Sequence, residues 1–327
     1  MTPAARVGVK GQVVSRFAPS PTGRLHLGHA WSAVQAHDFA RARGGAFLLR
    51  IEDLDPTRSR PENVDGVSED LRWLGLRWDG EVAFQSRRGA AYAAALDRLR
   101  EAGATYPCFC TRADIAGAGQ APHGSAGPVY PGTCRTPADW ERAAAAPHAI
   151  RLDVEAALAL LAKTPVVPAN AGTSTGEAHI ASSHRGSRLR GNGGVGETFL
   201  PVELDGSLGQ AAPRITGDVV LARKDAPAAY HLAVVVDDAW QGVTDVVRGT
   251  DLLEAVHVQR LLQALLGLPT PRYHHHPLVL GPDGQRLAKR HGAPALAEMR
   301  AAGADGRALA DGLRHGRLPS GFRLAAS

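Results

Sequence analysis

Short apolar runs alternate with longer helix-compatible segments along the N-terminal third of the chain. Residues 13–17 predict a short strand that a Pro/Gly turn ends, and residues 47–51 are a compact, largely apolar run, which is the pattern of a buried strand. The segments 28–42, 55–74 and 90–102 have small, capped or alanine-rich sequences that predict helices. Strands that alternate with helices in this way predict an α/β fold, in which helices cover a parallel sheet.

The pattern breaks between residues 106 and 200. Residues 106–140 hold all three cysteines together with many glycines and prolines, and residues 152–163 predict a helix. Residues 164–198 are rich in Gly, Ser, Thr and Asn, which predicts a poorly ordered insertion. A Gly-x-Gly-x-x-Gly sequence at 191–196 follows no predicted strand, so we do not interpret it as a nucleotide-binding motif.

The alternation returns in the C-terminal third of the chain. Residues 218–221, 233–236 and 277–280 predict strands, residues 252–266 predict a helix, and an alanine- and arginine-rich helical tail begins at residue 295. We therefore expect two halves of one α/β domain that are separated by an inserted region and followed by a short helical tail. The expected regions are 1–105, 106–200, 201–295 and 296–327.

Composition adds little to this picture but excludes some classes of protein. Of the 327 residues, 44 % are hydrophobic, which suffices for a large core. No run approaches the roughly 20 apolar residues that cross a bilayer, and the N-terminus lacks a secretory signal. We expect a soluble, cytoplasmic protein with no membrane partner. The net charge of +5 and the pI of about 9.4 only weakly favour a polyanionic partner.

The first candidate site for chemistry lies at residues 16–29, Arg-Phe-Ala-Pro-Ser-Pro-Thr-Gly-Arg-Leu-His-Leu-Gly-His. A strand here runs through a Pro/Gly turn into a helix N-terminus, which offers free N–H groups and a positive dipole end to phosphate. His26 and His29 are three residues apart, so both can face one ligand. Gly28 allows a base or a ribose to approach the backbone closely. The segment is therefore a candidate nucleotide site.

The second candidate site is the glycine-bounded loop at 284–292, which carries Arg286, Lys289 and Arg290. Such a loop can close over a triphosphate, with the lysine matching the negative charge that develops on the phosphates. In their order along the chain, residues 26–29 and this loop resemble the two signatures of class I aminoacyl-tRNA synthetases. Those signatures are commonly quoted as His-Ile-Gly-His and Lys-Met-Ser-Lys-Ser.

The resemblance implies a Rossmann-like catalytic domain that binds ATP, with Mg²⁺ accompanying the nucleotide. It implies catalytic roles for His26, His29 and Lys289, and contacts of the same three residues with ATP. Gly28 and Arg286 are also expected to contact ATP. The loop departs from the signature at Arg286, which replaces a lysine, and at Ala288, which replaces a serine. We expect the missing hydroxyl to slow activation without abolishing it.

Three further segments resemble the glutamate branch of this class: residues 16–23, residues 49–55 and residues 230–251. A glutamate site must satisfy a side-chain carboxylate, and arginine does so best. The resemblance implies that Arg16 and Arg248 bind this carboxylate. It also implies that Glu52 pairs with the α-ammonium group and that Tyr230 hydrogen-bonds the amino acid. The turn residues expected beside Arg16 in the glutamate site are Phe17, Ala18, Pro19 and Ser20.

The three cysteines form a candidate metal site within residues 106–140. Cys108, Cys110 and Cys134 can occupy three corners of a tetrahedron around zinc, and His123 is the usual type of fourth ligand. The pattern Cys-x-Cys…Tyr-x-x-x-Cys also resembles the zinc site of the glutamyl-Q tRNA(Asp) synthetases, which implies Tyr130 as the fourth ligand. The alternative without a metal is three reduced, partly buried thiols.

The resemblance implies an enzyme that activates glutamate with ATP, without tRNA, and transfers it to queuosine at the wobble position of tRNA(Asp). About 35 residues follow the basic loop, fewer than a typical domain needs, so we expect no separate anticodon-binding domain and a monomer. Two alternatives stay open. The first is a minimal glutamyl-tRNA synthetase that charges a tRNA 3′ end. The second is an inactive RNA-binding paralogue, supported only by Arg286 and Ala288.

Overall fold

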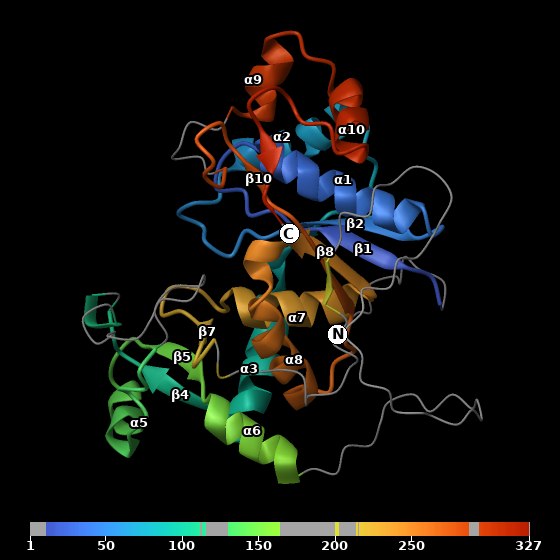
Figure 1. Cartoon of the computed structure of the whole chain (residues 1–327). Helices are drawn as coiled ribbons and strands as arrows, with labels where there is room; N and C mark the ends of the chain where they lie inside the picture. Colours follow the sequence, from blue (N-terminus) through green and yellow to red (C-terminus); the bar gives the residue numbers. More distant parts are fainter. Residues whose placement is uncertain are drawn as a thin grey trace, which may run out of the picture.

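The structure is a computed structural model that describes the chain over most of its length (Figure 1). The described residues are 11–111, 113–115, 130–163, 200–202, 214, 216–287 and 294–326. The expected insertion at 164–198 therefore lies outside them. Within the described ranges, no helix combines the length and the apolar character that crossing a bilayer requires.

Two groups of strands form the centre of the molecule. Strand β1 (Val14–Phe17) pairs in parallel with β2 (Ala46–Ile51), which continues in parallel to the short β3 (Ala83–Phe84). Strand β8 (Asp245–Gly249) pairs in parallel with β9 (Arg272–His276). The two groups meet where the N–H of Thr244 donates to the carbonyl of Val14 at 2.9 Å. The expected α/β fold with a parallel sheet is confirmed. On the far side of β9, β6 (Leu200–Val202) is antiparallel.

One layer of helices packs on this sheet beside β1 and β2, above the strands in Figure 1. Its central member is α1 (Leu27–Arg41), which buries small residues such as Ala30, Ala33 and Ala36 completely. Small side chains let the helix approach the sheet closely, while Trp31 and Phe39 fill the remaining space. The other helices of the layer are α2 (Pro61–Trp73), α9 (Leu296–Ala301) and α10 (Gly306–Arg314).

The second layer lies below the strands in Figure 1 and has its own apolar core. Apolar side chains of these helices, including Leu99, Leu232 and Leu261, are almost completely buried there. This layer positions the polar residues at the end of α7 beneath the sheet, where they become part of the site. Its helices are α3 (Gly89–Glu101), α6 (Val154–Lys163), α7 (Tyr230–Gln241) and α8 (Ala255–Leu265).

The region between the two halves forms a small antiparallel sheet of its own. Strand β4 (Thr105–Cys108) pairs with β5 (Ala149–Leu152), which pairs with β7 (Val220–Ala222). Helix α5 (Pro137–Ala143) packs against β4. This sheet carries the cysteines at one end and lies at the lower left of Figure 1. The boundaries expected for the four regions of the chain stay predictions.

The strand expected at 233–236 is wrong, because these residues belong to the helix α7. The run Ala-Val-Val-Val is short and uniformly apolar, and such a run has no periodicity that separates a strand from a buried helix. The helix ends at Gly242, whose φ of 69° is the left-handed conformation that glycine adopts at helix ends. The strands in this part of the chain are β8 and β9. They contain Arg248 and three histidines, and these polar residues do not fit the apolar pattern by which a buried strand is recognised.

The C-terminal part contains more than the expected helices. After α9 and α10, the chain ends in a short strand β11 (Arg323–Leu324) that pairs antiparallel with β10 (Val279–Leu280). The strand expected at 277–280 is thus shorter and belongs to this ribbon, outside the parallel sheet. The ribbon holds the start of the basic loop next to α1, because Leu287 and Val279 join the same core as α1.

Candidate functional site

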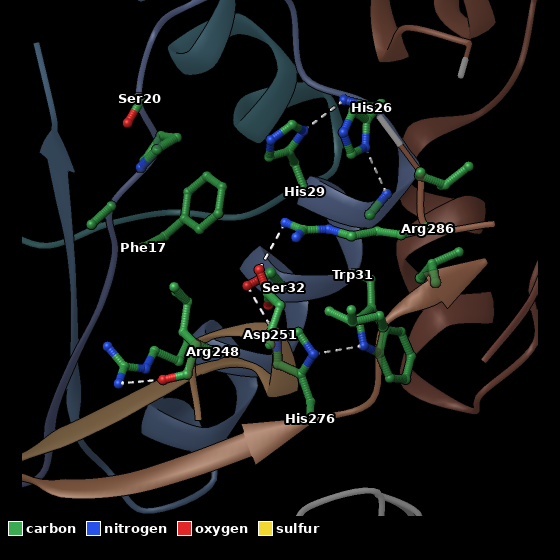
Figure 2. A pocket seen from close by; sticks show the side chains of 18 of the residues that line it. Phe17, Ser20, His26, His29, Trp31, Ser32, Arg248, Asp251, His276 and Arg286 are labelled. Carbon is green, nitrogen blue, oxygen red and sulfur yellow. Dashed lines mark hydrogen bonds and ion pairs between the residues drawn. The ribbon is translucent and has the colours of Figure 1, made fainter. Parts of the chain in front are cut away.

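A cavity of about 900 Å³ opens at the carboxyl ends of β1, β2 and β8, beside the N-terminus of α1. In open α/β sheets, ligands bind at such edges. Figure 2 shows residues from both halves of the chain facing this space. The structure brings together here every described residue that the sequence assigned to glutamate or ATP. They are Arg16, Phe17, Ala18, Pro19, Ser20, His26, Gly28, His29, Glu52, Tyr230, Arg248 and Arg286. Lys289 lies outside the described residues.

The two signature histidines build the start of α1. The N–H of Gly28 donates to His26 Nδ1 at 3.1 Å, and the N–H of His26 donates to His29 Nδ1 at 3.1 Å. The two rings contact each other at a tilt of 41°, with their centroids 3.8 Å apart. A Cβ on Gly28 would come within 3.1 Å of His26 Cε1. Gly28 therefore seats the His26 ring at the helix terminus, where the dipole favours an anion.

Arg286, the first residue of the second signature, forms an ion pair across the cavity. Its Nη2 lies 2.7 Å from Oδ2 of Asp251, while its side chain is 63 % exposed. Below it, the indole N–H of Trp31 donates to His276 Nδ1 at 3.1 Å and to the Pro277 carbonyl at 3.0 Å. The exposed guanidinium can leave Asp251 for a stronger anion, whereas the indole and imidazole are held in place (Figure 2).

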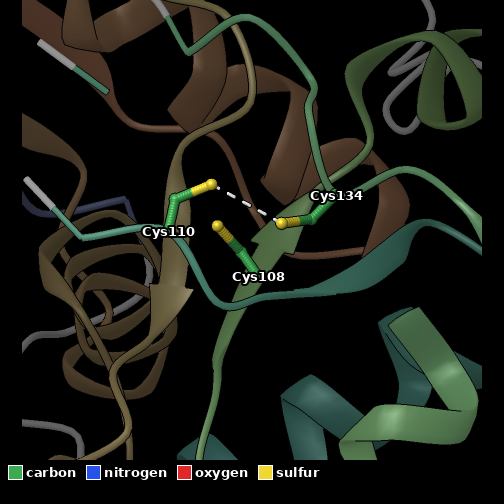
Figure 3. A group of neighbouring side chains, drawn as sticks. All are labelled: Cys108, Cys110 and Cys134. Carbon is green, nitrogen blue, oxygen red and sulfur yellow. Dashed lines mark hydrogen bonds between the residues drawn. The ribbon is translucent and has the colours of Figure 1, made fainter. Parts of the chain in front are cut away.

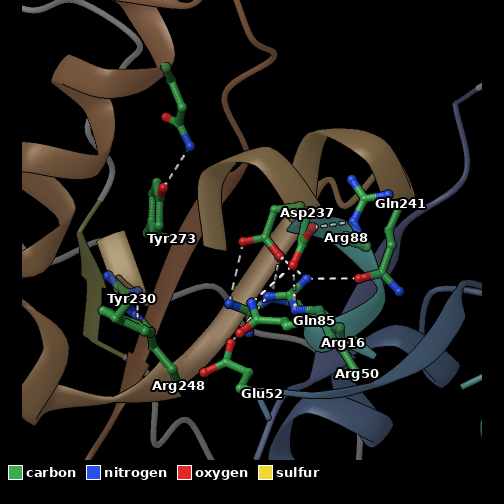
Figure 4. A network of polar contacts seen from close by, with 12 residues as sticks. Arg16, Arg50, Glu52, Gln85, Arg88, Tyr230, Asp237, Gln241, Arg248 and Tyr273 are labelled. Atoms are coloured by element: carbon green, nitrogen blue, oxygen red, sulfur yellow. Dashed lines mark hydrogen bonds and ion pairs between the residues drawn. The ribbon is translucent and has the colours of Figure 1, made fainter. Parts of the chain in front are cut away.

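A buried ion network forms the floor of the cavity (Figure 4). Arg16 donates from Nε and Nη2 to the two oxygens of Asp238, at 3.0 and 3.4 Å. Arg50 donates from Nη1 to Asp238 Oδ1 at 2.7 Å. Burial raises the pKa of Asp238, but Arg16 and Arg50 outweigh that effect and hold this pKa below its ordinary value. The carboxylate is thus kept ionised and orients both guanidinium groups.

Glu52 lies at the edge of the same network, directly after the end of β2. Its Oε1 is 3.5 Å from Arg50 Nη2. Burial raises the pKa of the Glu52 carboxyl, although the charges of Arg50 and Arg16 oppose the rise. A carboxylate that is costly to keep charged in a buried position gains from a cationic ligand. Its place on the cavity wall suits a substrate ammonium group.

Asp237, next to Asp238, anchors the network to α3 and its preceding loop. It accepts from Arg88 Nε at 2.5 Å, from Gln85 Nε2 at 2.9 Å and from Tyr92 Oη at 2.7 Å. These contacts leave its carboxylate fully buried and saturated with donors. Asp237 therefore holds the floor of the cavity rigid without facing the cavity itself.

Arg248 lies on β8 and is surrounded by neutral groups. It donates to His275 Nε2 at 3.3 Å, to Tyr230 Oη at 3.2 Å and to the Leu252 carbonyl at 3.0 Å. Only 5 % of the residue is exposed. No carboxylate among the described residues forms an ion pair with it, whereas Arg16 and Arg50 both have such partners. Among the described residues of the cavity, Arg248 is therefore a buried cation without an acidic partner.

The three cysteines converge at one end of the antiparallel sheet (Figure 3). Their Sγ atoms all lie within 4.8 Å of one another. The Oη atom of Tyr130 is 3.5 Å from Cys108 Sγ and 3.4 Å from Cys110 Sγ. Sulfur and phenol oxygen at these separations fit the donor set of a tetrahedral zinc site after small adjustments. His123, the alternative fourth ligand, lies outside the described residues.

The chain is similar in sequence to a known family of enzymes. A model of the catalytic domain of class I tRNA synthetases (E and Q) matches residues 12–159 and 208–316. A glutamyl-Q tRNA(Asp) synthetase of Rhodobacter capsulatus is 46 % identical over 89 % of this chain and 96 % of the relative. One from Nocardia farcinica is 47 % identical over 88 % of this chain and 79 % of the relative. The chain belongs to the glutamyl-Q tRNA(Asp) synthetase family. It is therefore an enzyme, a ligase of the aminoacyl-tRNA synthetase type.

Solved structures agree with the fold of this family. The glutamate–tRNA synthetase of Elizabethkingia anophelis superposes with a TM-score of 0.59 at 24 % sequence identity. The match covers 86 % of this chain and 53 % of the other, so the chain spans about half the length of that structural relative. At this identity the likeness establishes the fold alone.

Several residues at the site of this glutamyl-Q tRNA(Asp) synthetase family member were missed from the sequence. Arg50 carried a usable signal, because a charged residue inside an otherwise apolar strand needs a buried partner. Asp238 and Asp251 lie within the segments that carried the resemblance but received no role. His275 and His276 gave no signal, because three consecutive histidines do not show which of them is buried.

Proposed function

We propose that this enzyme activates glutamate with ATP to form glutamyl-adenylate and transfers the glutamate to queuosine in tRNA(Asp). The observation that carries the proposal is a single cavity that joins a buried, unneutralised arginine to a helix N-terminus built from the two signature histidines. The names of the relatives add the acceptor: they are described as glutamyl-Q tRNA(Asp) synthetases. ATP and tRNA are the partners that this family implies.

Glutamate carries two carboxylates and one ammonium group, and the cavity wall offers a counterpart for each charge. Arg248 has no acidic partner among the described residues and suits the side-chain carboxylate. Arg16 uses only two of its nitrogens, Nε and Nη2, to bond Asp238. It can therefore also contact the side-chain carboxylate of glutamate, together with Arg248. Glu52 suits the α-ammonium group. Tyr230 already bonds Arg248 and so can contact the same ligand.

ATP fits the other side of the cavity, next to α1. Its phosphates can approach the start of α1, where His26, Gly28 and His29 are packed together. Arg286 can exchange Asp251 for a phosphate oxygen, because its side chain is largely exposed. In this proposal Lys289 contributes a further positive charge. Mg²⁺ would accompany ATP as part of the substrate.

The reaction requires no protein nucleophile. An oxygen of the glutamate α-carboxylate attacks the α-phosphorus of ATP, and pyrophosphate leaves. A hydroxyl of the queuosine cyclopentene ring then attacks the carbonyl carbon of glutamyl-adenylate, and AMP leaves. The residues of the cavity would contribute by holding the reacting atoms in line and by stabilising the charge on the phosphates.

A zinc ion fits the cysteine cluster, where Cys108, Cys110, Cys134 and Tyr130 would hold it. Four protein ligands leave no open position, so such an ion would supply structural stability and no reaction chemistry. It would tie the end of β4 to the segment that contains Cys134. The identity of this metal is part of the proposal.

Two assays with purified protein test the proposal. Exchange of labelled pyrophosphate into ATP should require glutamate and should proceed without tRNA. Labelled glutamate should then enter tRNA(Asp) that contains queuosine and should not enter the same tRNA made without it. Incorporation that ignores queuosine would favour charging of a tRNA 3′ end. Absence of exchange would instead contradict glutamate activation.

A further inference from the structure

Arg248 differs from the other buried arginines of the site because its hydrogen-bond partners among the described residues are all neutral. Arg16 and Arg50 share Asp238, and Arg88 pairs with Asp237. Each of these pairs cancels charge inside the protein. The three groups that accept hydrogen bonds from Arg248 are an imidazole, a phenol and a carbonyl. A buried guanidinium without a counter-ion is costly unless a ligand supplies the negative charge.

His275 holds one side of this guanidinium. It is the direct register partner of Arg248 across the parallel pair β8 and β9. Its ring is fully buried, and its Nε2 accepts from Arg248 Nε at 3.3 Å. An imidazole nitrogen that accepts a hydrogen bond carries no proton, so the ring is the neutral tautomer with its hydrogen on Nδ1. The contact therefore orients Arg248 and leaves its charge intact.

The surroundings of His275 keep the ring neutral. Burial and the adjacent Arg248 lower the pKa of His275 to about 3. Two acidic groups lie on the described part of the cavity wall, and both are engaged elsewhere: Asp251 pairs with Arg286, and Glu52 lies beside Arg50. Neither of them neutralises Arg248.

We propose that His275 is a positioning and specificity residue that aims Arg248 at the ligand while preserving its uncompensated charge. This role rests on the proposed activation of glutamate. A ligand with a side-chain carboxylate neutralises Arg248, whereas a ligand with a neutral amide in the same place leaves the cation buried and unpaired. The site thereby favours glutamate over glutamine. An acidic residue in place of His275 would supply the counter-charge internally and remove this preference.

The test compares two substitutions of equal size and shape, His275→Gln and His275→Glu, in glutamate-dependent pyrophosphate exchange. His275→Gln keeps a neutral acceptor and should keep a KM for glutamate close to that of the wild type. His275→Glu should raise the KM for glutamate by about a hundredfold relative to His275→Gln, because an internal carboxylate competes at ion-pair distance. The KM for ATP should stay the same in both variants. If His275 acted only through packing, the variants His275→Gln and His275→Glu would have the same KM for glutamate, because their side chains have the same shape.

A second substitution covers the case in which His275→Glu does not fold. His275→Leu removes the acceptor without adding charge and should raise the KM for glutamate about tenfold, with the KM for ATP unchanged. His274→Gln is the matched control, since His274 bonds Asp245 and is the register partner of Val247, whereas His275 is the partner of Arg248. This control should not change the KM for glutamate.

The outcomes distinguish failure of the role of His275 from failure of the proposed function. Equal KM values for glutamate in His275→Gln and His275→Glu, with active wild-type protein, would overturn the role of His275 alone. A KM for glutamate that is unchanged in His275→Leu would overturn it as well. Wild-type protein that shows no glutamate-dependent exchange would contradict the proposed function and, with it, this specificity role.

Discussion

Replacing Gly28 with alanine probes how closely the signature histidines must be placed. The added Cβ would lie 3.1 Å from Cε1 and 3.2 Å from Nδ1 of His26. Carbon contacts are comfortable at roughly 3.5–4.0 Å, so the ring must move by about half an ångström. The same ring accepts a hydrogen bond from the Gly28 N–H and contacts the His29 ring, so both histidines shift when it moves.

This change has two consequences, one for the stability of the fold and one for the rate of the reaction. Weakening the helix cap costs about 0.5–2 kcal/mol, whereas replacing glycine by alanine in a helix gains about 0.5–1 kcal/mol. The free energy of unfolding should therefore fall by no more than about 1.5 kcal/mol. A displacement of about 1 Å at a reacting centre can cost 100-fold in rate, so we expect about a tenfold loss of glutamate-dependent pyrophosphate exchange.

Gly89→Ala provides the control for this measurement. Gly89 begins α3, and a Cβ there would meet only Pro227, at an ordinary 3.9 Å. Exchange rates and urea unfolding should be measured for both variants. We expect Gly89→Ala to retain normal exchange. Full activity in Gly28→Ala, or an equal loss in both variants, would refute the proposed tight placement of His26.

Three other predictions concern the cysteine cluster and the buried ion network. Cys134→Ser should lower the zinc content and the melting temperature, and a variant that keeps a full equivalent of zinc would contradict the ligand assignment. Asp238→Asn leaves Arg16 and Arg50 without their shared counter-charge and should lower the free energy of unfolding by about 3–5 kcal/mol in urea titrations; a change below about 1 kcal/mol would argue against the network. The folded pKa of Asp238 lies below its ordinary value of 3.8, so its contribution is complete above this value and is lost as the pH falls further. Wild-type protein should therefore lose more stability than Asp238→Asn on acidification from neutral pH to below about pH 4, and equal losses would contradict this origin.

The segments that were predicted best are those in which local chemistry determines the backbone. The turn before α1 contains two prolines and a glycine, and the histidines that follow cap the helix through their own side chains. Such contacts lie within a few residues of one another, so the sequence displays them directly. The cysteine spacing is similarly local at Cys108 and Cys110, and Cys134 joins them in the structure.

The elements that were missed depend on contacts across the chain. Residues 233–236 form a helix because their apolar side chains fill the core below the sheet, which no local pattern reveals. Arg248 and His275 occupy buried strands and bond each other across 27 positions of sequence. Asp238 neutralises Arg16 across 222 positions. Tertiary pairing of this kind overrides the expectation that charged residues lie at the surface.

The most direct test of the central claim is pyrophosphate exchange by wild-type protein without tRNA, measured with glutamate and with glutamine. A cavity that holds a side-chain carboxylate on Arg248 beside ATP predicts exchange with glutamate and little or none with glutamine. Equal exchange with the two amino acids, or none with glutamate, would contradict the claim.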